Sequence, residues 1–430
     1  MAITNVSSSS TATANAPGST NTGAMAMVTT LFFIWGFLTS LNDILIPHLK
    51  SIFSLNYAQA MLVNFAFFFA YAAFGILSGK IVEWIGYQRT MVAGLFTMCI
   101  GALLFVPAAS APSFPLFLSA LIVLAAGITA LQVAANPYVS VLGPSETASS
   151  RLNLTQAFNS LGTVLGPLLG GYFILRGVTA VANPESLPPA ALHAYKVHEA
   201  ATVKMPYIAI AFALVILALT IAFYKFPRLD MTRDFRPIGE KKDSMWRHRH
   251  VVLGAVCIFV YVGAEVSIGS FLINYFNQPN IGGLSALAAS ALVPFYWGGA
   301  MVGRFIGSAI LQKVKTGPLL ALCAVVAAVL VVISMLTFGH VAIWTILLVG
   351  LFNSIMFPSI FTLGIAEMGP LTGEASGLLV TAIVGGAIIP VAQGVLADSI
   401  GIHHAFVLPV LCYLFIAYYG MKGSKVIVQP

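Results

Sequence analysis

The sequence predicts an all-α transmembrane protein of twelve helices in two six-helix, pseudo-symmetric bundles, and three observations lead to this prediction. First, 59% of the 430 residues are hydrophobic and 8% are charged, whereas a soluble domain has about 45–50% and about 25%. Second, the apolar residues form repeated runs of about 20, which cross a hydrocarbon layer of about 30 Å as helices. Third, these runs do not alternate polar and apolar residues as the strands of a membrane barrel do. Helices therefore have to satisfy the backbone hydrogen bonds within the membrane.

The elements follow one another along the chain in two sets of six. A tail over residues 1–23, rich in Ser, Thr, Ala and Asn, lacks the features of a secretory signal, and we expect it to be disordered. The N-terminal bundle, 24–226, is predicted to have spans at 25–47, 57–83, 89–109, 113–139, 152–175 and 204–226. After a linker at 227–249, the C-terminal bundle, 250–421, is predicted to have spans at 250–276, 285–312, 317–337, 341–365, 374–397 and 403–421. A short tail, 422–430, ends the chain.

An internal repeat supports the division into two bundles. Pro137 is followed five positions later by Leu142-Gly143, and Pro358 is followed at the same spacing by Leu363-Gly364. Gly75 and Gly79 align in the same way with Gly303 and Gly307. Duplication of a six-helix unit places a substrate site between the two halves.

The cations of the chain, whose formal net charge is +7, gather in the linker rather than over a groove that could bind nucleic acid. The linker region holds Lys225, Arg228, Arg233, Arg236, Lys241, Lys242, Arg247 and Arg249. The positive-inside rule then makes the linker and both termini cytoplasmic. A smaller set of cations, Lys50, Arg176, Lys196 and Lys204, falls on the other side.

Signals for catalysis or for a cofactor are missing from the sequence. Cys99, Cys257, Cys323 and Cys412 all lie inside apolar runs without the paired spacing of a metal or redox site. No Walker loop, His-Glu zinc pattern or nucleophile elbow occurs. We therefore expect no cofactor, no metal, no enzymatic activity and no transport driven directly by ATP.

Two carboxylates lie inside apolar runs, Asp43 in the first span and Glu265 in the seventh. Burying an acid at such depth is expensive, so we expect both to line a cavity or pathway, although hydrogen bonding within a helix interface would also explain them. Arg304 is a possible counter-charge, or it could extend its guanidinium to the membrane surface.

Amides and aromatic residues complete a site for a neutral polyol. The amides are Asn42, Gln132, Asn136, Gln156 and Asn159, and each can both donate to and accept from a sugar hydroxyl. Trp35 offers a ring to the apolar face of a pyranose. Taken singly, each of these residues is also explained by helix packing.

Several blocks of sequence resemble a known family. GILSGKIVEWIGYQRT at 75–90 is similar to the loop between the second and third helices of the major facilitator superfamily. Four further blocks resemble its fucose-galactose-glucose:proton symporter family: SLNDILIPHL at 40–49, AANPYVSVLGP at 134–144, RLNLTQAFNSLG at 151–162 and FPSIFTLGI at 357–365.

This resemblance implies twelve helices, alternating access and proton-coupled uptake of a hexose across a bacterial inner membrane. It also implies that Asp43 is the proton-linked aspartate and that Gln156, Asn159 and Arg304 occupy cavity positions. The chain departs from the fucose-transporting members at two positions, where Gln132 replaces a glutamate and Phe357 replaces a tyrosine.

Glu265 lies where those members carry an amide, so the acid has moved across the cavity, a combination that resembles the glucose/galactose branch. Our hypothesis is that Asp43 carries the proton while Glu265 and Gln132 hydrogen-bond the sugar from opposite halves. The expected partners are a small neutral hexose, a proton and membrane lipid, without nucleic acid, and the expected assembly is a monomer. The alternatives are coupling to sodium, fucose or another neutral monosaccharide as substrate, and a membrane-embedded enzyme or receptor.

Overall fold

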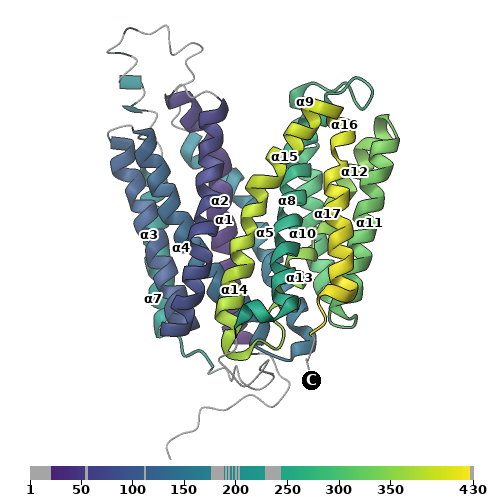
Figure 1. The fold of residues 1–430 in the computed structure, drawn as a ribbon. Coiled ribbons are helices and arrows are strands. Elements are labelled where there is room, and N and C mark those ends of the chain that lie inside the picture. Colours follow the sequence, from purple (N-terminus) through teal and green to yellow (C-terminus); the bar gives the residue numbers. More distant parts are fainter. Residues whose placement is uncertain are drawn as a thin grey trace, which may run out of the picture.

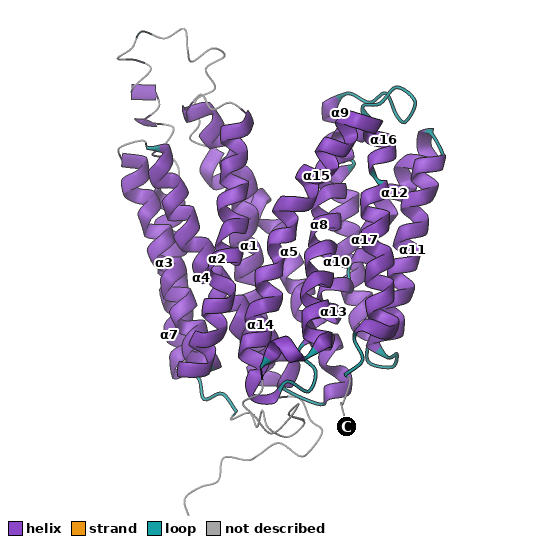
Figure 2. Cartoon of the chain, in the orientation of Figure 1, coloured by secondary structure: helices purple, strands orange, loops and turns teal. Residues whose placement is uncertain are grey.

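The computed structural model describes residues 21–53, 57–110, 113–175, 204–227 and 244–426, with isolated positions between 188 and 201. Within the helices, the side chains of residues 41–53, 57–62, 64 and 167–175 are outside the description. The predictions for the tail before residue 21 and for linker residues 228–243 also lie outside it. Every regular element in the described part is helical (Figure 2).

The first half of the chain forms long, continuous helices. Their bounds are α1 Thr22–Phe53, α2 Tyr57–Ile85, α3 Tyr87–Ser110, α4 Phe114–Val141, α5 Ala148–Leu175 and α7 Lys204–Phe223. Each helix covers most of one of the six spans predicted for this half. The main differences are that α1 runs six residues beyond the predicted end at 47 and that α5 begins four residues before 152.

The second half also covers its six predicted spans, but several of them are interrupted. The helices are α8 Arg249–Phe276, α9 Ala286–Ser290, α10 Val293–Ile310, α11 Thr316–Leu336, α12 Gly339–Asn353, α13 Met356–Gly364, α14 Thr372–Thr381, α15 Gly385–Ile400, α16 Ile402–Ala405 and α17 Val407–Tyr418. The tenth span thus consists of α12 and α13. The eleventh consists of α14 and α15, joined by a 3₁₀ turn at Ala382–Val384.

Eleven helical segments in the described part of the chain are long and apolar enough to cross a membrane. Many of their large apolar side chains point outward, among them Trp84, Phe212, Phe223, Leu336 and Val395. A soluble protein rarely exposes apolar patches of this extent, because water opposes them. The molecule is therefore a multi-pass membrane protein whose outer surface is covered by lipid.

The two halves of the chain form two groups of helices that lie side by side (Figure 1). The helices of the two groups approach each other at one end and diverge toward the other (Figure 1). At the end where they meet, α7 ends and α8 begins, on either side of the linker (Figure 1). We call it the linker end.

Glycines allow α2 and α14 to touch at the linker end. A Cβ atom at Gly79 would lie 2.7 Å from the carbonyl oxygen of Gly373, and one at Gly377 would lie 2.7 Å from the carbonyl oxygen of Gly75. Backbone thus packs directly on backbone between the two halves, which only residues without a side chain permit.

Hydroxyl groups join the halves on the other side of the linker end. The Ser149 hydroxyl of α5 lies 2.6 Å from that of Thr362 on α13 and accepts from Thr316 at 2.9 Å. The hydroxyl of the next residue, Ser150, donates to the backbone oxygen of Ser308 at 2.7 Å. The contact between the halves is therefore made here by neutral hydrogen bonds.

Candidate functional site

A polar cavity of about 140 Å³ lies where the two halves meet near the middle of the helices. A single water needs only about 10–15 Å³ on the same measure. The cavity is lined by Trp35 of α1, Tyr71 of α2, Gln132 of α4, Gln156 of α5, Tyr261, Val262 and Glu265 of α8, Arg304 of α10, Phe357 of α13 and Ile383 of the 3₁₀ turn after α14. Both halves therefore contribute to one site.

A larger groove of about 470 Å³ runs along α1. It is lined by Thr22, Met25, Ala26, Thr29, Thr30, Phe33 and Phe158. The hydroxyls of Thr29 and Thr30 donate to carbonyl oxygens of their own helix, at 2.7 and 3.1 Å. Because its walls offer few free polar groups, this groove does not suit a polar solute, and the smaller cavity is the candidate site.

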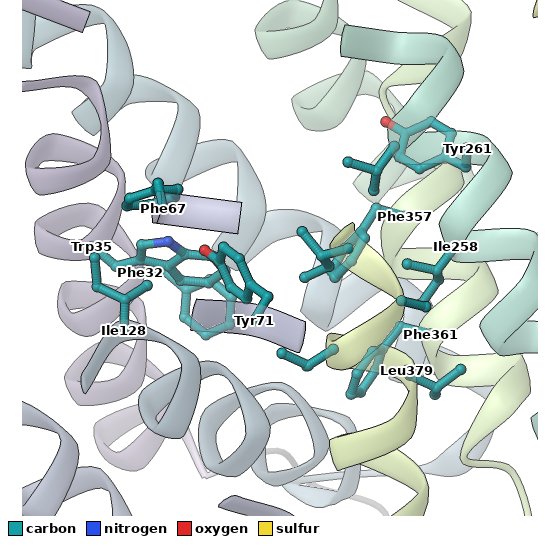
Figure 3. Close-up of a cluster of buried hydrophobic side chains, with 14 of the residues drawn as sticks. Phe32, Trp35, Phe67, Tyr71, Ile128, Ile258, Tyr261, Phe357, Phe361 and Leu379 are labelled. Atoms are coloured by element: carbon teal, nitrogen blue, oxygen red, sulfur yellow. The ribbon is translucent and has the colours of Figure 1, made fainter. Parts of the chain in front are cut away.

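Gln132 forms the polar centre of the wall contributed by the first half. Its Nε2 donates to the Tyr71 hydroxyl at 2.7 Å, and that hydroxyl also lies near the Trp35 side chain. Figure 3 shows the Trp35 nitrogen and the Tyr71 oxygen facing each other. The Gln132 Oε1 atom is buried and has no hydrogen-bond partner among the described residues. It is therefore a fixed acceptor that a ligand hydroxyl can meet.

Gln156 supplies a donor beside this acceptor. Its side chain is 5% exposed, and its Nε2 atom has no partner in the described part of the chain. A buried amide without a partner is costly, so such groups are normally satisfied by water or by a ligand.

Glu265 and Arg304 form the charged part of the wall contributed by the second half. Glu265 Oε1 lies 3.9 Å from Arg304 Nη2, and the two side chains are 12% and 15% exposed. Glu265 Oε1 is buried and accepts no hydrogen bond from the described residues. The guanidinium thus compensates the carboxylate electrostatically, while this oxygen keeps an unused capacity to accept a hydrogen bond.

Arg304 points into the protein, so of the two orientations predicted from the sequence it adopts the inward one. It donates to the hydroxyl of Ser160 on α5 and, through Nε, to the backbone oxygen of Ser354 at 3.4 Å. In addition, its own backbone oxygen accepts from Asn153 Nδ2 at 2.7 Å. Arg304 therefore connects the two halves as well as lining the cavity.

Aromatic rings form the apolar walls. Trp35 packs 5.2 Å from Phe32, and Phe357 lies 6.0 Å from Phe361, measured between ring centroids. Figure 3 shows Trp35 with Tyr71 in one half, and Phe357 with Tyr261 in the other. Such rings can cover the C–H faces of a sugar while the amides and the acid bind its hydroxyls.

The structure brings most of the predicted site residues together. Those that line the cavity are Trp35, Gln132, Gln156, Glu265, Arg304 and Phe357. Asn159 does not line it, because its Nδ2 donates to the backbone oxygen of Phe32 at 2.9 Å and so joins α5 to α1. Asn136 is fully buried outside the lining, with neither amide atom paired to a described residue. The side chains of Asn42 and Asp43 lie outside the description.

Sequence reasoning did not find Tyr71, Tyr261, Val262 or Ile383. Tyr261 lies four positions before Glu265, and this spacing puts both residues on one helix face, so it could have been found. Tyr71 stands in an apolar run of α2 with no polar neighbour to mark it.

The site offers acceptors and donors from both halves between aromatic walls. This arrangement suits a small solute with several neutral hydroxyl groups, each of which donates and accepts. Among the described residues there is no group of three or more His, Cys, Asp or Glu side chains that could hold a metal ion.

Comparison with known proteins identifies the class. A model described as the Major Facilitator Superfamily matches residues 24–389. The chain is 52% identical over 404 residues, 94% of each protein, to the glucose/galactose transporter of Brucella abortus. It is 35% identical to the L-fucose-proton symporter of Escherichia coli, covering 93% of each. The crystal structure of the transporter FucP in the outward conformation matches with a TM-score of 0.86 at 33% identity, covering 94% of this chain and 99% of that one.

The chain is a transporter-fold protein of the major facilitator superfamily. Within the superfamily it belongs to the fucose-galactose-glucose:proton symporter family, as its sequence blocks predicted.

Proposed function

We propose that this protein is a proton-coupled symporter that takes up glucose or galactose by alternating access. The observation that carries the proposal is the cavity between the halves, where Gln132 Oε1, Gln156 Nε2 and Glu265 Oε1 are buried without partners among the described residues. These atoms converge from α4, α5 and α8, and sugar hydroxyls match their chemistry. The names of the relatives, a glucose/galactose transporter at 52% identity and an L-fucose-proton symporter at 35%, support the same substrate class.

The arrangement of the halves supports an outward-facing state. The linker is rich in cations, so the positive-inside rule places the linker end and both termini in the cytoplasm of a bacterial cell, with the helices in its inner membrane. The halves touch at that end and diverge at the other (Figure 1). Alternating access then consists of rocking the bundles 24–226 and 250–421 about the cavity, with residues 227–249 as the connection.

The proposed roles follow from the positions of the side chains. Gln132, Gln156 and Glu265 bind sugar hydroxyls, and Trp35 and Phe357 cover its apolar faces. Asp43 carries the coupled proton, a role that rests on the sequence resemblance. One charge crossing a potential of 100 mV releases about 2.3 kcal/mol, enough for roughly fifty-fold accumulation.

Uptake into vesicles tests the function. The protein is reconstituted and labelled glucose is supplied outside, with an imposed proton gradient and no sodium on either side. We expect accumulation that collapses when a protonophore is added and that unlabelled galactose inhibits. Accumulation that requires sodium would show that the coupling ion is sodium and not the proton. An excess of fucose that inhibits better than glucose or galactose would contradict the assigned substrate, and the absence of any hexose transport would overturn the function.

A further inference from the structure

The helix of the tenth span is broken beside the cavity, between the end of α12 at Asn353 and the start of α13 at Met356. Pro358 has no N–H group with which to reach back to the Ser354 carbonyl, which favours the break. Two side chains satisfy carbonyl groups at this point. The Tyr261 hydroxyl donates to the Asn353 backbone oxygen at 3.1 Å, and Arg304 Nε donates to the Ser354 backbone oxygen at 3.4 Å.

The same two donors face the Glu265 carboxyl group. Arg304 Nη2 lies 3.9 Å from Glu265 Oε1, and Tyr261, one helical turn before Glu265, lines the same cavity with its side chain beside that carboxyl. The other titratable groups of the described residues near Glu265 are two tyrosines. Tyr296 of α10 donates to the Glu265 backbone oxygen at 3.2 Å, and Tyr413 of α17 interacts electrostatically with the Glu265 carboxyl group.

A tyrosine hydroxyl has one proton and can therefore donate to one acceptor at a time. A neutral carboxyl at Glu265 can donate its own proton to the Tyr261 oxygen, so that Tyr261 keeps its bond to the Asn353 carbonyl. An ionised carboxylate is a stronger acceptor than a carbonyl oxygen. It draws the hydroxyl proton to itself, so the Asn353 carbonyl loses the hydrogen bond from Tyr261.

We propose that Tyr261 is a positioning residue that couples the charge of Glu265 to the helix break at Ser354–Ile355 and, through α13, to the closure of the linker end. The proposal rests on the proton-coupled function above.

Helix α13 connects the break directly to the contact between the halves at the linker end. Phe357, in the first turn of α13, lines the cavity, and Thr362 near its other end pairs with Ser149 of the opposite half at 2.6 Å. Loss of the bond at the end of α12 therefore loosens the junction between α12 and α13, and α13 carries this cross-bundle contact. A neutral Glu265 favours the closed linker end, and a charged one favours its opening.

A double-mutant cycle tests the coupling. Spin labels are placed on cysteines introduced at two exposed positions, Trp84 near the end of α2 and Lys313 in the turn after α10, in a background without native cysteines. The distribution of distances between the labels gives the ratio of open to closed linker ends. It is measured without sugar, at acidic and alkaline pH, in four proteins: the parent, Glu265→Gln, Tyr261→Phe and the double variant.

In the parent at alkaline pH, Glu265→Gln should lower the ratio of open to closed forms about tenfold, the effect of one buried hydrogen bond. In the Tyr261→Phe background the same substitution should change it less than about twofold. Equal effects of Glu265→Gln in both backgrounds would overturn the proposal, as would a ratio that does not respond to Glu265→Gln at either pH.

Tyr275→Phe is the matched control. Tyr275 is also fully buried on α8, and its hydroxyl donates to the Ser334 backbone oxygen at 2.9 Å, away from Glu265. In the Tyr275→Phe background, Glu265→Gln should change the ratio of open to closed forms as much as it does in the parent. If that response is also lost with Tyr275→Phe, the effect of Tyr261→Phe is merely structural. Glucose uptake by the parent protein is measured separately. If uptake fails while the coupling between Glu265 and Tyr261 is observed, the assignment of glucose as substrate is wrong and the inference about Tyr261 still holds.

Discussion

The glycine contact between α2 and α14 gives the sharpest test of how the halves fit together. A Cβ atom added at Gly79 would lie 2.7 Å from the Gly373 carbonyl oxygen and 3.2 Å from the Cα of Glu374. Both are backbone atoms, so no side-chain rotation can relieve the overlap. Gly79→Ala can be accommodated only if α2 and α14 move apart, which weakens the closed linker end.

Overpacking of this kind costs about 1–3 kcal/mol. Because the overlap exists only where the two halves touch, the whole of that energy acts on the equilibrium between closed and open linker ends. The open form should gain a factor of about 5 to 150. Binding of sugar from the opposite side should weaken by up to the same factor, because less of the protein is in the outward-facing state.

Spin labels at the exposed positions Trp84 and Lys313, together with a glucose binding isotherm, measure both effects. Gly298→Ala is the control, because a Cβ atom at Gly298 meets no atom within 4 Å. The control should leave distances and binding unchanged. If Gly79→Ala gives the parent distance distribution and affinity, the closure does not depend on this contact and the reasoning is wrong.

Three further predictions concern proton coupling and the cavity. Asp43→Asn should abolish gradient-driven accumulation of glucose but keep counterflow exchange, and uphill uptake in that variant would remove Asp43 from coupling. Gln132→Leu should weaken glucose binding about 5- to 30-fold, because the acceptor Oε1 is lost. The control Gln393→Leu removes a buried amide outside the cavity lining and should leave glucose binding unchanged. Equal losses of affinity in the two variants would refute the role of Gln132. Arg304→Lys keeps the charge beside Glu265 but loses the Nε donor to Ser354, so turnover should fall about tenfold with little change in affinity, whereas unchanged turnover would contradict the bridging role.

Hydropathy was enough to predict the helices, because lipid requires every spanning segment to satisfy its backbone internally. It could not locate the break between Asn353 and Met356, since the apolar run continues through it. Pro358 marked the region, but a proline within a membrane helix is often accommodated without a break. Side-chain donors from α8 and α10 satisfy carbonyl groups at this break, and the sequence of α12 and α13 does not contain them.

The cavity was predicted from polar residues that interrupt apolar runs, and this signal has a physical limit. Gln156 and Asn159 look equivalent in the sequence, yet three residues turn an α-helix through about 300°, so their side chains point about 60° apart. Gln156 lines the cavity and Asn159 binds the backbone of α1. Tyr71 escaped detection because a tyrosine ring fits an apolar run, and only the neighbours of its hydroxyl reveal a polar role. Tyr261 had one signal in the sequence, its spacing of four residues from Glu265.

Buried polar atoms without a partner among the described residues provide the free energy of binding at this site. Gln132 Oε1 and Gln156 Nε2 belong to one half and Glu265 Oε1 to the other, and none of them has a hydrogen-bond partner among the described residues. Each such buried atom costs about 1–3 kcal/mol, so a solute that supplies the missing partners gains more than the same hydrogen bonds would give in water. A solute that reaches atoms of both walls gains most when the walls approach each other. Binding then favours a conformation in which the halves close around the cavity, and this difference in affinity between conformations is what allows a ligand to drive the change in access.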